Sequence, residues 1–213
     1  MVFLDISATP EGRTTHLETV RRVRAQLSIP LTTGGGVSSA EHARALLEAG
    51  ADKVSVNTAA VARPELITEI ATTFGSQCAI LALDAARRLS PAENGADQSD
   101  WEVVVRSGAV RTGIDAVGWA TQAVDMGAGE ILLTSWDRDG TRSGYDLPLL
   151  SAISAAVNVP IIASGGADSP EHMVEALHAG ADAVLAASIF HDGNYTVQQL
   201  KEVLAQNGIE VRR

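Results

Sequence analysis

The chain of 213 residues is 46% hydrophobic and 20% charged, which excludes a disordered or collagen-like protein and predicts one globular domain over residues 1–213. With 16 basic against 26 acidic residues, the formal net charge is −10, and only 3 Trp, 2 Tyr and 3 Phe are present. The sequence therefore lacks both the basic surface and the stacking rings of a nucleic-acid-binding protein. A small anionic substrate is compatible with this charge, since backbone amides bind phosphate.

We expect no targeting signal or membrane anchor from this sequence. No apolar run approaches the roughly 18 residues of a membrane helix, and the acidic start at residues 1–5 does not resemble a signal peptide. The single cysteine, Cys78, cannot form an internal disulfide. These features predict a cytoplasmic protein without a membrane partner.

Short apolar runs alternate with amphipathic stretches along the chain. The predicted strands cover residues 2–6, 29–33, 53–56, 78–83, 130–134, 160–163 and 183–187. The predicted helices cover residues 15–26, 39–49, 64–74, 114–126, 147–157, 170–179 and 196–206. Strand and helix in regular alternation predict a parallel sheet, and the Val, Ile, Leu and Ala content of the strands predicts that both sheet faces are covered.

One segment interrupts this alternation. Residues 90–113 are longer and more polar than a strand–helix loop, and residues 101–106 alternate like a hairpin strand. We expect a flap beside the functional site.

An internal repeat organises the sequence. A shift of 130 residues aligns Ile29–Thr58 with Val159–Ser188 without a gap, and 12 of the 30 positions are identical. Two halves of four strand–helix units each predict a TIM-type (β/α)8 barrel, with residues 1–77 in the first half and residues 78–213 in the second. Only seven strands are predicted, however, and the counterpart of the strand at residues 78–83 would fall before Met1. We therefore expect an α/β barrel of seven units that lacks its first strand and helix. A doubly wound sheet is the competing fold, but the first strand is not followed by the required G-x-G-x-x-G turn.

Glycine clusters follow two strands in equivalent halves of the repeat. Glycines allow a close approach of backbone amides, and each cluster is joined by a small polar side chain after the next strand. A single cluster is more often a tight turn, but two in symmetric places predict a ligand with a phosphate at each end. The clusters and their partners are Gly34–Gly36 with Asn57 and Thr58, and Ser164–Gly166 with Ala187 and Ser188.

Several polar residues are predicted at strand ends between these clusters: Asp5, Asp84, Thr134, Ser135, Asp137 and Asp139. Asp84 ends an otherwise apolar strand, and a carboxylate in that position of a barrel is placed to transfer protons. The alternative is a helix cap or an ion pair with Arg87 or Arg88. The polar loop at residues 136–146 is a simple turn or a functional loop, and its length favours the latter. No histidine has a partner at metal-ligand spacing, so neither a metal nor another cofactor is predicted.

Five motifs at predicted strand ends are distinctive: Phe-Leu-Asp-Ile at 3–6, Gly-Gly-Gly-Val at 34–37, Ala-Leu-Asp-Ala at 82–85, Gly-Glu-Ile-Leu-Leu-Thr-Ser at 129–135 and Ala-Ser-Gly-Gly-Ala at 163–167. Together they resemble the cyclase subunit of imidazole glycerol phosphate synthase, an enzyme of histidine biosynthesis. The resemblance covers the whole chain. The sister isomerase of the same pathway shares the repeat and the Asp-Arg-Asp-Gly-Thr turn at 137–141. The segments at 57–60 and 143–146 are more similar to the cyclase.

The resemblance implies a lyase and cyclase reaction. Ammonia reacts with a phosphoribulosyl-formimino substrate that carries two phosphates, and the products are imidazole glycerol phosphate and aminoimidazole carboxamide ribonucleotide. Asp84 is implied as the general acid, with Asp5 in a supporting role. Thr134 and Asp139 are implied to contact substrate hydroxyls. The implied phosphate ligands are Gly36, Asn57 and Thr58 at one end, and Gly140, Ser164, Gly165, Gly166, Ala187 and Ser188 at the other.

The resemblance also implies a glutaminase subunit as partner, docked at the bottom of the barrel to supply ammonia through a ring of charged residues. Lys53 and Glu130 match two positions of that ring, and the alternative is a plain ion pair that seals the barrel floor. The family's first strand, with the aspartate that acts as general base, and its mobile loop do not match any part of this sequence. We therefore expect weak or no activity from the chain alone. A non-catalytic protein that binds the glutaminase is the second alternative.

Overall fold

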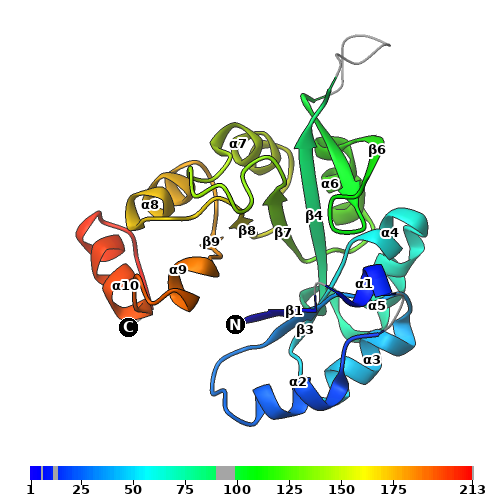
Figure 1. Cartoon of the computed structure of the whole chain (residues 1–213). Coiled ribbons are helices and arrows are strands. Elements are labelled where there is room, and N and C mark those ends of the chain that lie inside the picture. Colours follow the sequence, from blue (N-terminus) through cyan, green and yellow to red (C-terminus); the bar gives the residue numbers. More distant parts are fainter. Residues whose placement is uncertain (6, 12–13, 90–98, 213) are drawn as a thin grey trace.

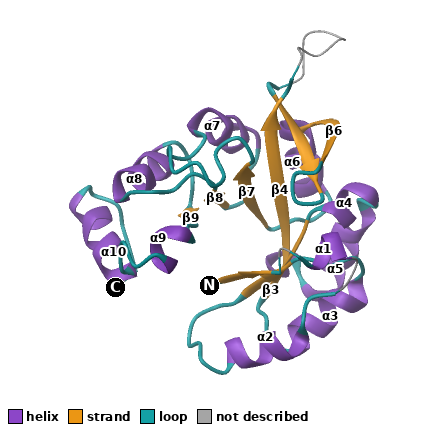
Figure 2. Ribbon diagram, viewed as in Figure 1, coloured by secondary structure: helices purple, strands orange, loops and turns teal. Residues whose placement is uncertain are grey.

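The computed structural model describes residues 1–5, 7–11, 14–89 and 99–212, and shows a curled, mainly parallel sheet with helices on its outer side (Figures 1 and 2). Seven strands form the parallel part in the spatial order β1-β2-β3-β4-β7-β8-β9. Their bounds are β1 Val2–Leu4, β2 Thr32–Gly34, β3 Lys53–Val56, β4 Ala79–Arg87, β7 Glu130–Ser135, β8 Ile161–Ser164 and β9 Ala183–Val184. The expected α/β barrel architecture is confirmed as an open, curled sheet of this type.

Within the described residues, seven α-helices correspond to the seven predicted from periodicity, and three short α-helices are additional. The predicted helices are α2 Leu17–Arg24, α3 Ala40–Glu48, α5 Glu65–Phe74, α6 Ala116–Asp125, α7 Leu147–Ala156, α8 Pro170–His178 and α10 Val197–Gln206. The additional helices are α1 Ala8–Glu11, α4 Thr58–Ala62 and α9 Ser188–His191. Both α4 and α9 begin beside residues predicted to bind phosphate.

The expected hairpin is present. Strands β5 (Trp101–Val105) and β6 (Val110–Asp115) pair antiparallel, and β5 also pairs with the extended end of β4. In the part of the chain that the structure describes, the sheet therefore has nine strands, two of which lie outside the parallel series. Much of the insertion predicted at 90–113, namely residues 90–98, lies outside the described residues.

The internal repeat is preserved in the hydrogen-bonding register. In β1 and β2, Val2 pairs with Thr32, and in β7 and β8 the residues 130 positions later, Leu132 and Ile162, form the equivalent pair. Local contacts repeat in the same way. Asp52 accepts a hydrogen bond from the backbone of Leu31 at 2.8 Å, and Asp182 accepts one from Ile161 at 2.9 Å.

Several predicted boundaries are wrong by a few residues. Cys78 does not begin a strand, because it ends a short 3-10 helix, Ser76–Cys78, and is half-buried. The last strand ends at Val184 rather than at residue 187. Helix α6 begins at Ala116 because the side chain of Asp115 caps it, accepting a hydrogen bond from Gly118 N at 2.7 Å.

The apolar residues of the strands and the inner helix faces form one core. Its largest fully buried side chains come from both halves of the repeat: Leu31, Leu66, Ile67, Ile70, Ile80, Leu81, Leu83, Ile131, Leu149, Leu150, Ile153 and Ile161. The described helices include none that is long and apolar enough to span a membrane.

Candidate active site

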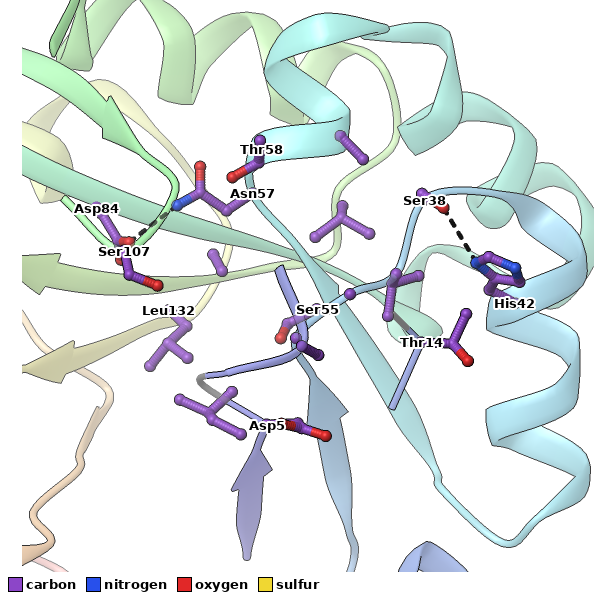
Figure 3. A pocket seen from close by; sticks show the side chains of 18 of the residues that line it. Asp5, Thr14, Ser38, His42, Ser55, Asn57, Thr58, Asp84, Ser107 and Leu132 are labelled. Atoms are coloured by element: carbon purple, nitrogen blue, oxygen red, sulfur yellow. Dashed lines mark hydrogen bonds between the residues drawn. The ribbon is translucent and has the colours of Figure 1, made fainter. Parts of the chain in front are cut away.

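A cavity of about 430 Å³ opens at the carboxyl ends of the first strands and is shown in Figure 3. Asp84 and Ser107 lie at one end of it, and Thr14 and His42 lie at the other. Its lining contains six of the site residues predicted from the sequence: Asp5, Gly36, Asn57, Thr58, Asp84 and Thr134. These residues are distant in sequence, and the parallel strands bring them together because all strands of such a sheet end on the same side.

Asp84 is held within the site by its neighbours. The side-chain amide of Asn57 donates a hydrogen bond to Asp84 Oδ2 at 2.9 Å. The pKa of Asp84 is raised to about 6: burial is the largest cause, the hydrogen bond from Asn57 opposes it, the negative charge of Asp139 adds to the increase, and the hydrogen bond from Thr134 also opposes it. A carboxyl group with a pKa near neutrality is suited to donate a proton under physiological conditions.

The alternative partners considered for Asp84 are engaged elsewhere. Arg87 forms an ion pair with Asp100 and lies over the ring of Trp101. Arg88 forms an ion pair with Asp115. The prediction that Asp84 ends its strand is also wrong, because β4 continues to Arg87 to pair with β5. Asp84 is thus a mid-strand carboxylate that faces the cavity.

Strand register aligns three polar residues across the sheet. Asp84 of β4 pairs with Thr134 of β7, and Thr134 pairs with Ser164 of β8. The predicted acid, a predicted hydroxyl-binding residue and a predicted phosphate ligand therefore lie in one row. The sheet alone fixes this arrangement, because each residue occupies the corresponding position of its strand.

The first glycine cluster places its backbone against the cavity. Gly35 and Gly36 adopt φ angles of 95° and 68°, which favour glycine. A Cβ atom at Gly35 would lie 2.2 Å from the backbone oxygen of Asp5, so only glycine fits there. Asp5 itself donates its backbone N–H to Gly34 O at 2.9 Å, and its carboxylate accepts a hydrogen bond from Ser7 at 3.3 Å.

The second set repeats the backbone conformation of the first. Gly165 and Gly166 have φ angles of 93° and 92°. Ala187, at the start of α9, has φ −125° and ψ −62°, close to the −126° and −90° of Asn57 at the start of α4. The residues that line the 430 Å³ cavity do not include this set, which comprises Gly140, Ser164, Gly165, Gly166, Ala187 and Ser188.

The structure adds lining residues that sequence reasoning missed: Thr14, Ser38, His42, Ser55 and Ser107. His42 lies against Ser38, with Nδ1 3.1 Å from its hydroxyl (Figure 3). Ser55 is 3% exposed within the otherwise apolar part of β3, and this break in the pattern was an available signal. Ser107 lies in the hairpin turn, a position that no local pattern relates to the cavity.

The hairpin is anchored beside the site. The backbone N–H of Arg106 donates to Thr58 Oγ1 at 3.0 Å, and the Asn57 amide lies 3.5 Å from the carbonyl oxygen of Val104. Gly108 packs against the ring of Trp136, and a Cβ atom there would lie 1.9 Å from it. The turn therefore contacts both α4 and the loop that follows β7.

At the opposite end of the strands, Lys53 Nζ donates to Glu130 Oε2. Their side chains are 30% and 12% exposed, so the pair is partly buried. The two residues begin β3 and β7, which flank β4. The two residues thus form an ion pair, as the alternative to a role in ammonia entry predicted. In the described part of the chain, no group of three or more His, Cys, Asp or Glu side chains is placed to hold a metal ion.

The comparison with known protein families identifies a family to which this chain is similar. The model of the family described as "Histidine biosynthesis protein" matches residues 1–196. The match therefore spans every described element from β1 to α9, including all the candidate site residues.

Proposed function

The chain belongs to the histidine biosynthesis protein family, and from this premise we propose that it is the cyclase subunit of imidazole glycerol phosphate synthase. Family membership makes it a histidine biosynthesis enzyme with a TIM-type fold. The choice of the cyclase over the sister isomerase rests on the sequence segments at 57–60 and 143–146.

The observation that carries the proposal is the position of Asp84 in the cavity. In the proposed reaction, ammonia reacts with the phosphoribulosyl-formimino substrate, and Asp84 in its protonated form donates a proton as the general acid. Its pKa of about 6 supports this role, because a substantial share of the carboxyl groups is protonated near that pH. Asn57 orients the carboxyl group through its hydrogen bond.

We propose that the two glycine sets bind the two phosphates of the substrate. Gly36, Asn57 and Thr58 would hold one phosphate at the wall of the cavity. The repeated backbone conformation of the second set supports an equivalent site there. Thr134, which pairs with Asp84 and Ser164 in the sheet, and Asp139 would contact substrate hydroxyls, and Asp5 would support the first site. The second set comprises Gly140, Ser164, Gly165, Gly166, Ala187 and Ser188.

We further propose that ammonia reaches the site from a glutaminase partner bound at the amino ends of the strands. Lys53 and Glu130 would then control its entry, because their ion pair lies beside β4, the strand that carries Asp84. The partner is required in this proposal only as a source of ammonia, so free ammonium salts replace it in an assay.

The test is ammonia-dependent consumption of the bis-phosphate substrate by the 213-residue chain, with both products identified by mass spectrometry. Long incubation at high enzyme concentration detects slow turnover, and calorimetric titration with the substrate reports binding separately. Slow formation of both products, lost in Asp84→Asn and retained in Asp100→Asn, is the expected result. Isomerisation of the isomerase substrate would instead identify the sister enzyme. Substrate binding without products would identify a non-catalytic protein.

A further inference from the structure

One arginine connects the three chain segments that carry the second set of site residues. Arg142 lies in the loop between β7 and α7, which also contains Gly140. Its guanidinium forms an ion pair at 3.7 Å with Asp168, which follows the glycines after β8. It forms a second ion pair with Asp192 at the end of α9, the short helix that begins at Ser188. The loop, the turn after β8 and α9 therefore meet at one side chain.

The tip of this loop has few other contacts. Arg142 has a φ of 59°, in the left-handed region that residues other than glycine seldom adopt. A Cβ atom added to Gly140 would meet no atom within 4 Å, so the tip is loosely packed there. The loop is fixed to the neighbouring turn further along, where Gly144 N donates to Gly166 O at 2.9 Å. The side chain of Arg142 connects the loosely packed part to both neighbouring segments.

The barrel architecture does not by itself require this charged cluster. The 130-residue shift that relates the two halves also relates the three charged positions to the first half. Their equivalents there are uncharged: Gly12, Ser38 and Ala62. The two halves nevertheless share the positive φ angles of their glycines and the register of their strands. A cluster confined to one of two equivalent halves indicates a role at the site of that half.

Global stability is not the main effect of these ion pairs. The side chains of Arg142, Asp168 and Asp192 are 47%, 40% and 51% exposed. Ion pairs this exposed contribute little to the free energy of unfolding, because water competes for both partners. They do restrict how the three segments lie relative to one another. Segments ordered before a ligand binds lower the entropic cost of binding.

We propose that Arg142 is a positioning residue for the second phosphate of the substrate. Its two ion pairs hold Gly140, Gly166 and Ser188 in the arrangement that binds the phosphate, and the guanidinium stays on the two carboxylates. One positive and two negative side chains give the cluster a net charge of −1, so the backbone amides rather than the cluster attract the anion. The inference rests on the proposed function, because it takes the second set to be a phosphate site.

Titration of the full chain with inorganic phosphate, followed by NMR, measures the two sets separately. The amide resonances of Gly166 and Ser188 report on the second set, and those of Gly36 and Thr58 report on the first. In Arg142→Gln, we expect phosphate affinity to fall about tenfold at the second set, because its segments must then be ordered on binding. The affinity at the first set should not change.

Three further measurements accompany this variant. Arg142→Lys keeps a cation in the cluster and should recover part of the lost affinity. Arg63→Gln removes a similarly exposed ion pair, with Glu69, and should leave the second set unchanged. Thermal unfolding should be nearly the same in all of these variants. A loss of affinity at both sets, together with lower thermal stability, would overturn the proposal in favour of a general structural role.

Removal of the carboxylates distinguishes positioning from direct contact with the phosphate. Asp168→Asn and Asp192→Asn each delete a negative charge of the cluster, which by charge alone strengthens the binding of an anion. Positioning predicts the opposite sign, and we expect about threefold weaker phosphate binding at the second set in each variant. Unchanged or stronger binding in both variants would overturn the proposal. Stronger binding would show that the released Arg142 side chain contacts the phosphate itself.

Arg142→Gly separates the side chain from the backbone conformation. Glycine accepts a φ of 59° without strain, so affinity retained in this variant would overturn the role of the ion pairs. We expect the same loss as in Arg142→Gln.

Failure of this inference is distinguishable from failure of the proposed function. If phosphate binds the second set equally well in the wild type and in Arg142→Gln, the positioning role alone is refuted. If phosphate shifts no resonance of the second set in the wild type, the second phosphate site is refuted, and the role of Arg142 with it. The ammonia-dependent turnover assay decides the cyclase activity independently of both results.

Discussion

The side-chain amide of Asn57 donates a hydrogen bond to Asp84 Oδ2 at 2.9 Å, linking the start of α4 to the middle of β4. Asn57 thereby connects a residue of the first glycine set with the proposed acid. The hydrogen bond lowers the pKa of Asp84, whereas burial, the larger effect, raises it to about 6. The pair makes the protonation of Asp84 sensitive to a residue that also lines the cavity.

Replacement of Asp84 tests the catalytic role. Asp84→Asn keeps the shape of the side chain and removes its proton, so turnover should fall about 100-fold to 10,000-fold with a smaller change in substrate affinity. Steady-state kinetics with ammonium salts measures both quantities. Asp100→Asn, at an exposed carboxylate of the ion pair with Arg87, is the matched control. Equal losses in the two variants would argue against a specific role.

Stability should depend on pH through the same carboxyl group. Its pKa in the folded chain, about 6, lies above the ordinary value of 3.8, so the folded state retains a proton that the unfolded state has lost. The contribution of Asp84 to the free energy of unfolding is therefore fully present below about pH 4 and decreases as pH rises to about 6. Relative to the wild type, Asp84→Asn should gain about 3 kcal/mol between these limits. Urea unfolding of both proteins at several pH values checks this, and a constant difference would contradict it.

Removal of the Asn57 amide should change the pH profile. Asn57→Leu deletes a hydrogen bond that lowers the pKa of Asp84, so the pKa should rise further. The descending limb of the rate against pH should then move to higher pH, and the KM should rise because Asn57 lines the cavity. Asn207→Leu, which removes an exposed amide bonded to Val203 O, provides the control. An unchanged profile in Asn57→Leu would separate Asn57 from the protonation of Asp84.

The two glycine sites differ in the space around them. Gly35→Ala forces a positive φ on alanine and puts its Cβ 2.2 Å from Asp5 O, so the free energy of unfolding should fall by more than about 2 kcal/mol. Gly140 has φ 73° and no atom within 4 Å of an added Cβ, so Gly140→Ala should cost only about 1 kcal/mol. Chemical unfolding measures the difference. Similar costs would show that the contact with Asp5 adds nothing to the backbone strain.

The ion pair at the floor is suited to a double-mutant cycle. Lys53→Met leaves the largely buried Glu130 without its partner and should destabilise the chain by about 1–3 kcal/mol. Adding Glu130→Leu should recover much of that loss, because the unpaired charge is then gone. Thermal and urea unfolding of the single and double variants give the coupling energy. Additive losses would indicate that the two charges do not interact.

Periodicity and composition were sufficient for most of the fold. Alternating apolar strands and amphipathic helices have distinct spacings, so seven strands and seven helices were predicted close to their observed places. The strand at 53–56 agrees with the structure at both ends. Boundaries failed where a cap or a tertiary pairing decided them, as at Asp115, whose side chain starts α6, and at Arg87, where pairing with β5 lengthens β4.

For the candidate site, too, some features could be predicted from the sequence and others depended on the tertiary structure. The sequence by itself determined which residue types stand at the carboxyl ends of the strands, because the repeat and the glycine clusters are local patterns. Only the tertiary structure decided that Asp84 pairs with Asn57 rather than with Arg87 or Arg88, and that Ser107 reaches the cavity. Local spacing specifies a strand or a helix. A pKa and a hydrogen-bond partner depend on groups that the register of distant strands brings within a few ångströms.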